Sequence, residues 1–263
     1  MAFLFRDDGY DASKRQTGFA RYRQLLSYFG FAWWKAGFLT VLGLLPLAFG
    51  IVSAILLSSF VVLLPASLAG GMIFGPFLAA LYDAVMRGLR FSPDNWWASY
   101  KRSWKQNWKA SLFPGALLGL MLGAYAFMAY IAFTLDTWRD GRTIAAYLLS
   151  AFLLVLINSL YWPQLVLFSL PAADRIRNMI LFTAKYLWRV TVATLLQVFY
   201  WALYIFFAPW SLVLMPLLGI WFIVFLSELI LYDGLNAELR IEEQFYELEG
   251  DPFEEEDDTE DLS

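Results

Sequence analysis

The stretch that decides the fold runs from Ala36 to Tyr82 and reads AGFLTVLGLLPLAFGIVSAILLSSFVVLLPASLAGGMIFGPFLAALY. Its 47 residues contain no charged side chain, because the nearest charges are Lys35 and Asp83. A helix needs about 20 apolar residues to cross the hydrocarbon core of a bilayer. The stretch therefore predicts two membrane spans joined by a tight hairpin, with the turn at Pro65-Ala66-Ser67.

Three more charge-free stretches complete the count. Each is bounded by a pair of charged residues: Lys109 and Asp136, Arg142 and Asp174, Arg189 and Glu228. The first two hold one span each, and the third holds two short spans that turn at Pro209-Trp210-Ser211. We therefore predict an all-α polytopic membrane protein with six transmembrane helices, at 38–62, 67–88, 111–134, 144–169, 190–208 and 211–232.

The composition agrees with a membrane protein and argues against an enzyme. The chain has 263 residues, of which 60% are hydrophobic and 16% charged, whereas soluble domains are about 25% charged. It has no Cys and no His, so disulfides, Cys-ligated metals and histidine bases are excluded. No Walker loop or Rossmann fingerprint is present. We expect a non-enzymatic protein with no cofactor, no metal and no catalytic residues.

The positive charges predict the orientation in the membrane. With six spans, 17 of the 19 Lys and Arg residues fall on one side, and only Arg139 and Arg142 fall on the other. The positive-inside rule then places both termini in the cytosol. The outer face is nearly bare, since two of its three loops have only a few residues. Any ordered partner is therefore expected in the cytosol or within the membrane.

Three regions follow from this reading. Residues 1–35 form a cytosolic amphipathic segment, residues 36–232 form the transmembrane domain, and residues 233–263 form an acidic cytosolic tail. Residues 238–263 carry 13 Asp and Glu against one Arg. Beyond about residue 250 the tail is expected to be disordered, because it cannot bury enough apolar surface. It either solvates the chain or docks on a basic surface, which is that of a partner or of this protein itself.

A basic and aromatic segment follows the second predicted span. Ser92-Pro93-Asp94 predicts a helix start. At helical spacing the aromatic side chains share one arc and the cations fill the next: Trp97, Tyr100, Lys101, Arg102, Trp104, Lys105, Trp108 and Lys109. Such a helix either anchors in the headgroup layer or docks on a partner protein. Its place between two spans argues against nucleic acid. A second amphipathic segment is predicted at about 172–189.

Small residues recur at four-residue spacing in two of the predicted spans. They are Gly71 and Gly75 in the second span, and Gly115, Gly119 and Gly123 in the third. Small stripes allow helix backbones to approach closely in lipid. They predict helix packing within the chain or, alternatively, the interface of a homo-oligomer.

Few polar side chains occur within the predicted spans, and they are candidate site residues. They are Asp83, Asn158, Gln164, Gln197 and Glu228. Either they are satisfied near the membrane interface, or they line one polar pocket that opens to the cytosol. No carboxylate lies at the midplane of a span, which argues against an ion or proton path.

One stretch resembles a known family. Gly75-Pro76-Phe77-Leu78-Ala79-Ala80-Leu81-Tyr82, the basic and aromatic segment 96–109 and the span that begins at Ser111 are similar to the YesL-like family of bacterial membrane proteins. The resemblance implies the bacterial plasma membrane and an accessory role in carbohydrate-uptake ABC transport, with permease subunits as partners. The leading hypothesis is therefore an accessory or assembly protein. The alternative is a self-contained small-molecule transporter or channel.

Overall fold

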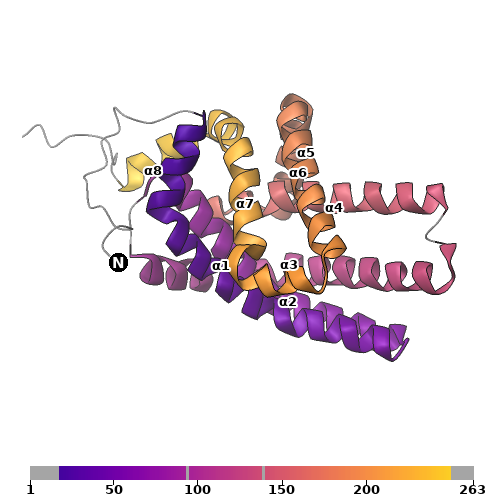
Figure 1. Cartoon of the computed structure of the whole chain (residues 1–263). Helices are drawn as coiled ribbons and strands as arrows, with labels where there is room; N and C mark the ends of the chain where they lie inside the picture. The colour runs from indigo at the N-terminus through magenta and orange to yellow at the C-terminus, as the bar shows by residue number, and fades with distance from the viewer. Residues whose placement is uncertain (1–17, 93–94, 138–139, 250–263) are drawn as a thin grey trace, which may run out of the picture.

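The computed structural model describes residues 18–92, 95–137 and 140–249 (Figure 1). Within these ranges the regular structure is entirely helical. The helices are α1 (Gly18–Leu56), α2 (Phe60–Leu89), α3 (Trp96–Thr134), α4 (Gly141–Leu167), α5 (Ala172–Lys185), α6 (Leu187–Phe206), α7 (Trp210–Leu239) and α8 (Ile241–Glu249). Six of them, all except α5 and α8, are long and apolar enough to cross a membrane. The predicted all-α fold with six candidate spans is confirmed.

The two longest helices extend well beyond a single span. Helices α1 and α3 have 39 residues each, or about 58 Å, against about 30 Å for the hydrocarbon core. Helix α1 runs without interruption through the predicted boundary at residue 35. Helix α3 joins the basic and aromatic segment to the third span. The prediction of separate amphipathic helices at these two places is wrong, because no residue there breaks the helix. Helix α5 is a separate amphipathic helix, as predicted.

The turn between α1 and α2 lies earlier than predicted. It is formed by Leu57, Ser58 and Ser59, and Ser58 has a left-handed backbone (φ 48°). The Ser59 side chain caps α2 by accepting a hydrogen bond from the Val62 amide. Pro65, the predicted turn residue, lies inside α2. Proline is tolerated there because membrane helices satisfy the freed backbone groups in other ways.

The other two turn predictions were closer. The turn between α6 and α7 lies at 207–209, so the predicted turn at 209–211 is displaced by two residues. Helix α3 begins after Asn95 rather than after Ser92. The Asn95 side chain accepts hydrogen bonds from the amides of Trp97 and Ala98, which is the usual role of an N-cap residue.

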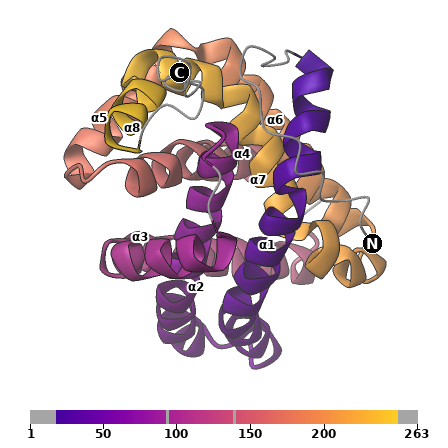
Figure 2. The same cartoon turned by 90° about the vertical axis from the view of Figure 1, so that its left-hand side faces the viewer.

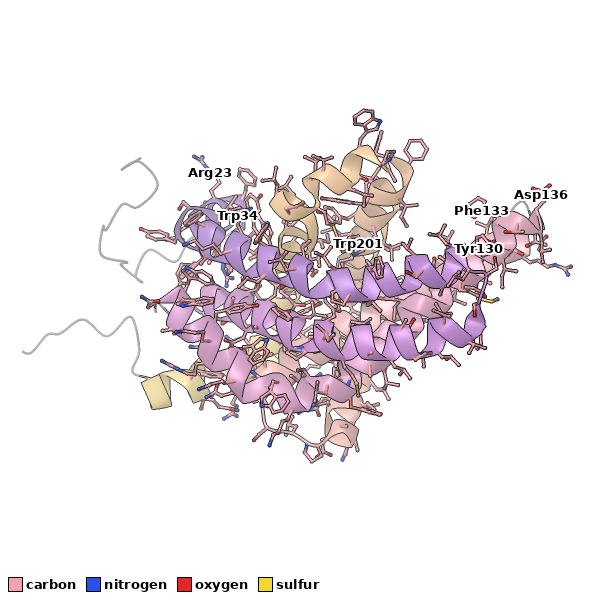
Figure 3. The ribbon with its side chains drawn as sticks, turned by 90° about the horizontal axis from the view of Figure 1, so that it is seen from below. Arg23, Trp34, Tyr130, Phe133, Asp136 and Trp201 are labelled. Carbon is pink, nitrogen blue, oxygen red and sulfur yellow. The ribbon has the colours of Figure 1, made fainter. Side chains whose placement is uncertain are left out.

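The helices are arranged around α2. Helix α2 contacts α1, α3, α4 and α7. In Figure 1, α3 and α4 run side by side, while α6 and α7 form a hairpin that runs steeply to them. Figure 3 shows Arg23 and Trp34 at one end of the molecule and Tyr130, Phe133 and Asp136 at the other. We call the first the basic end, where α1 and α3 begin and α2 ends. Figure 2 turns this end toward the viewer.

The tightest helix contact joins α2 to α3, and it uses all five predicted glycines. A Cβ atom built on Gly119 would stand 2.6 Å from the Cα of Gly71, and one on Gly115 would stand 2.8 Å from the Cα of Gly75. A Cβ on Gly123 would collide with Ser67. Both glycine stripes are therefore occupied within the chain, as the first of the two alternatives predicted.

The core lies toward the basic end. Trp33 is fully buried, donates a hydrogen bond to the carbonyl oxygen of Ala84 (2.9 Å), and packs on Phe225 with ring centroids 4.5 Å apart. Toward the other end, large apolar side chains such as Val61 and Phe133 are exposed. Such surfaces are stable in contact with lipid, so these parts of the helices suit the hydrocarbon core.

Candidate functional site

The first half of α3 presents an exposed basic and aromatic surface. We call it the docking face, and its members are Trp97, Lys101, Arg102, Trp104, Lys105, Trp108 and Lys109. Its three tryptophans are between 36% and 48% exposed, and its cations are exposed as well. Tyr100 was predicted to belong to the same arc but is only 6% exposed, since it points inward and packs edge-on against Trp96.

Cations and indoles are paired on this face. The Lys101 Nζ atom lies 5.3 Å from the centre of the Trp97 ring, and the Lys109 Nζ atom lies 5.6 Å from that of Trp108. Both distances suit cation–π contacts. Trp104 packs edge-on against Phe77 of α2, with centroids 6.3 Å apart. The face can therefore offer indoles to an apolar partner and cations to carboxylates or phosphates.

The helix that carries the docking face packs closely against α2. On the opposite side of the helix, Ser103 and Ser111 are buried. A Cβ on Gly75 would collide with the carbonyl oxygen of Ser111, so the backbones of α2 and α3 are in direct contact at this point. Close backbone packing of this kind fixes the orientation of the face relative to the rest of the bundle.

Two of the predicted polar residues line one cavity. Asn158 and Gln197 belong to the wall of a cavity of about 410 Å³ between α1, α2, α3, α4, α6 and α7. The Asn158 side chain donates to the Leu154 carbonyl (2.7 Å) and accepts from the Trp162 indole (2.8 Å). Gln197 donates to the Ser159 hydroxyl.

The other three predicted polar residues do not line the cavity that contains Asn158 and Gln197. Asp83 forms an ion pair with Arg87 (2.8 Å) and lines a separate cavity of about 50 Å³. Gln164 donates to the Leu160 carbonyl of its own helix. Glu228 is fully buried, and neither of its carboxylate oxygens has a hydrogen-bond partner among the described residues. Of the two alternatives, the one in which all five side chains line one pocket is contradicted, because similar depth in the membrane does not give side chains the same direction around their helices.

The start of the acidic tail folds back on the basic end. The Arg90 guanidinium lies 3.7 Å from the centre of the Phe245 ring in α8. Glu242 accepts a hydrogen bond from the Tyr232 hydroxyl (3.0 Å), and Asp233 pairs with Arg21 (2.9 Å). Between Asp233 and Phe245 the tail therefore contacts this protein's own basic end. The part beyond residue 250 lies outside the described residues.

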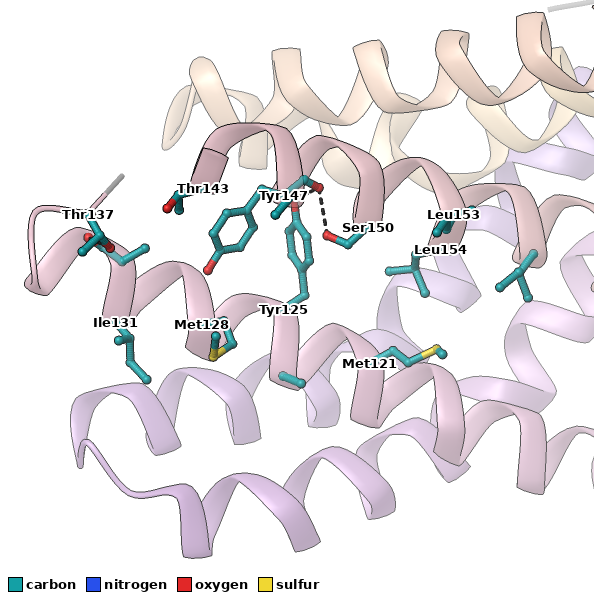
Figure 4. Close-up of a pocket in the computed structure, with 14 residues that line it drawn as sticks. Met121, Tyr125, Met128, Ile131, Thr137, Thr143, Tyr147, Ser150, Leu153 and Leu154 are labelled. Atoms are coloured by element: carbon teal, nitrogen blue, oxygen red, sulfur yellow. Dashed lines mark hydrogen bonds between the residues drawn. The ribbon is translucent and has the colours of Figure 1, made fainter. Parts of the chain in front are cut away.

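A groove between α3 and α4 was not anticipated from the sequence. It has a volume of about 790 Å³ and is lined mainly by apolar side chains (Figure 4). Tyr125 and Tyr147 meet across it with ring centroids 5.3 Å apart, and the Tyr125 hydroxyl donates a long hydrogen bond (3.4 Å) to the Tyr147 carbonyl. Large side chains such as Met121 and Met128 on this face of α3 could have indicated looser packing.

The described residues contain no group of three Asp, Glu, His or Cys side chains that could hold a metal ion. Comparison with protein-family models, with curated proteins and with solved structures finds no match to this chain. The resemblance to the YesL-like family therefore remains a prediction from the stretch that begins at Gly75. The chain is a multi-pass membrane protein by the length and composition of its helices.

Proposed function

We propose that this protein is a non-enzymatic accessory or assembly protein of the bacterial plasma membrane that binds a transporter through the docking face. The observation that supports this most directly is the exposure of three tryptophans beside four cations on one half of α3. Tryptophan and arginine are enriched where proteins bind one another, and they often dominate the binding energy.

The length of α3 supports a protein partner. Residues 111–134 of this helix are enough to cross the hydrocarbon core. Because α3 is one continuous helix of 39 residues, its basic half extends beyond that core instead of forming a separate helix in the headgroup layer. The positive-inside rule assigns this half to the cytosol. The docking face is then within reach of a cytosolic or membrane-embedded subunit.

The resemblance to the YesL-like family suggests the identity of the partner, a permease subunit of a carbohydrate-uptake ABC transporter. The test is purification of the tagged full chain from its native membranes in mild detergent, followed by identification of the proteins that co-purify. We expect transporter subunits in stoichiometric amount. A chain that purifies alone, or only with copies of itself, would contradict the proposal.

A double variant tests the surface. Trp104→Ala with Trp108→Ala should lower the recovered partner about tenfold or more, since a buried tryptophan at an interface contributes about 2 kcal/mol or more. The matched control is Trp188→Ala with Trp210→Ala, which removes two exposed indoles elsewhere and should leave recovery unchanged. Equal recovery of the partner from both double variants would show that the docking face does not bind the partner.

The alternative, a self-contained transporter, has one supporting observation: Asn158 and Gln197 share a cavity. Because the chain has no Cys, single cysteines can be introduced at these two positions and treated with a water-soluble maleimide. Labelling at both, with none at the control position Gln164, would favour the transporter. No labelling at any of the three would count against it.

A further inference from the structure

The central cavity described above has the size and lining of a ligand site. Its volume of about 410 Å³ lies in the range typical of small-molecule sites. Most of its wall is apolar and comes from six helices, with Leu44, Phe74, Leu122, Leu154 and Val224 as examples. Trp201 contributes from α6, which packs against α4 and α7 (Figure 3).

The polar groups of the cavity lie close together. The rings of Tyr82 and Trp162 are stacked with centroids 6.4 Å apart, and the Trp162 indole donates to Asn158. The next residue, Ser159, accepts from Gln197. This series of contacts connects Tyr82, Asn158 and Gln197, three of the polar residues in the wall of the cavity.

Two of these groups have unused hydrogen-bonding capacity. Tyr82 is 3% exposed, and its hydroxyl has no hydrogen-bond partner within the described ranges. Gln197 is 6% exposed and uses its amide nitrogen toward Ser159, which leaves its carbonyl oxygen as an acceptor for something in the cavity. A molecule in the cavity that pairs with both groups would gain two hydrogen bonds.

The charge of the wall restricts what that molecule can be. Among the residues that the structure describes, no Lys, Arg, Asp or Glu lines the cavity. A charged headgroup would therefore enter without a counter-ion from these residues, which is strongly unfavourable in an apolar interior.

We propose that this cavity binds a neutral amphiphile with a single hydroxyl head, of the long-chain alcohol class. The hydroxyl of such a molecule accepts a hydrogen bond from Tyr82 and donates one to the Gln197 carbonyl oxygen, while its chain fills the apolar part of the cavity. This site is separate from the docking face, so it stands whether or not the proposed accessory function is correct.

The experiment uses the purified full chain in lipid nanodiscs and a dodecanol analogue that carries a diazirine in its chain. After irradiation, the labelled residues are identified by mass spectrometry. We expect labels on cavity residues of α4, α6 and α7. Unlabelled dodecanol should compete about tenfold better than dodecane or dodecanoate, since these two lose the hydroxyl hydrogen bonds or carry a charge.

A conservative variant tests the polar end. Tyr82→Phe removes one oxygen and retains the stacking on Trp162, so it should fold normally while weakening competition by dodecanol about tenfold. The thermal unfolding midpoint verifies folding. The control is Tyr147→Phe, which changes a tyrosine of the α3–α4 groove and should not alter the label.

Three results would overturn the proposal. Labels confined to lipid-facing residues or to groove residues outside the cavity wall, such as Met128 and Tyr147, would mean that the cavity is not a site. Equal competition by dodecane would mean that the space accepts an acyl chain without recognising a head. Unchanged competition by dodecanol in a folded Tyr82→Phe variant would show that the Tyr82 hydroxyl does not bind the alcohol.

Discussion

Helix α3 takes part in two hairpins that pack in opposite ways. Toward α2 it presents Gly115 and Gly119, and the two backbones are in contact. Toward α4 it presents Met121, Tyr125 and Met128, and a groove of about 790 Å³ separates the helices. The same helix therefore forms the tightest and one of the most open interfaces of the bundle (Figure 4).

The difference shows what holds membrane helices together. In lipid, apolar side chains gain little by leaving the bilayer for a neighbouring helix, so association depends on close packing and on polar contacts. Small side chains let the backbones of α2 and α3 approach closely between Ser67 and Gly75 of α2 and between Ser111 and Gly123 of α3. Larger side chains hold α3 and α4 apart, and lipid can fill the space between them at little cost.

The largest effect is expected from Gly119→Leu. Its side chain would collide with the Gly71 backbone, so α2 and α3 would separate, at a cost of about 3 kcal/mol. Unfolding in mixed detergent micelles measures this. The matched control is Ala124→Leu, which enlarges a groove residue of the same helix and should change the free energy of unfolding by less than about 0.5 kcal/mol. Similar losses in both variants would contradict the distinction between the two interfaces.

The next effect concerns a polar contact of the packed region. Asp83→Asn weakens the ion pair with Arg87, whose side chains are both largely buried. We expect a loss of about 2 kcal/mol, as for other hydrogen bonds between charged groups. The exposed pair between Lys185 and Glu238 is the control, and Lys185→Met should lower the free energy of unfolding less than Asp83→Asn does, because solvent screens an exposed pair. A larger loss from Lys185→Met would reverse the expected order.

A smaller effect is expected in the groove. Tyr147→Ala removes the edge-on contact with Tyr125, and aromatic pairs of this kind contribute about 1 kcal/mol. Tyr125→Phe removes only a long hydrogen bond and should cost less than about 0.5 kcal/mol. Detergent unfolding of both variants provides the measurement. A loss above about 3 kcal/mol in either would show that the groove is a packed interface.

The smallest effect is a pH dependence at the exposed contact between α5 and α7. The hydrogen bond with Glu238 raises the pKa of Lys185 above its ordinary value of 10.5. The folded chain then holds this proton more tightly than the unfolded chain, so the stabilisation is complete below pH 10.5 and is lost as the pH rises through the raised pKa. Unfolding midpoints of the wild type and of Lys185→Met should differ by the same amount at pH 7 and pH 9, and converge only above pH 10.5. Convergence between pH 7 and pH 9 would exclude this pair as the cause.

Much of the fold could be predicted because it depends on local composition. Charge-free runs longer than a bilayer thickness marked all six candidate spans, and the glycine spacing indicated the α2–α3 contact. The turn at Ser58 and Ser59 was missed because no charge interrupts the stretch from Ala36 to Tyr82, so a proline was taken as the break. In a membrane helix proline is a weak signal, as Pro65 inside α2 demonstrates.

The candidate site was only partly predictable. The exposed tryptophans and cations of the docking face follow from helical spacing, which also misplaced Tyr100, because the direction in which α3 meets α2 is not encoded in the pattern of one helix. The unused groups of Tyr82 and Gln197 come from helices far apart in the chain. Only their packing through Trp162 brings them to one cavity.

The sequence by itself determined the helical class, the six apolar helices and the surfaces on which charge gathers, since each depends on residues close together in the chain. Tertiary structure alone decided which polar side chains share a cavity, that Asp83 and Glu228 are kept away from it, and that the α8 end of the acidic tail rests on Arg90. These outcomes depend on the rotation of each helix about its axis. That rotation is fixed by the fit of whole helix surfaces, because in lipid hydrophobicity alone does not select which faces meet.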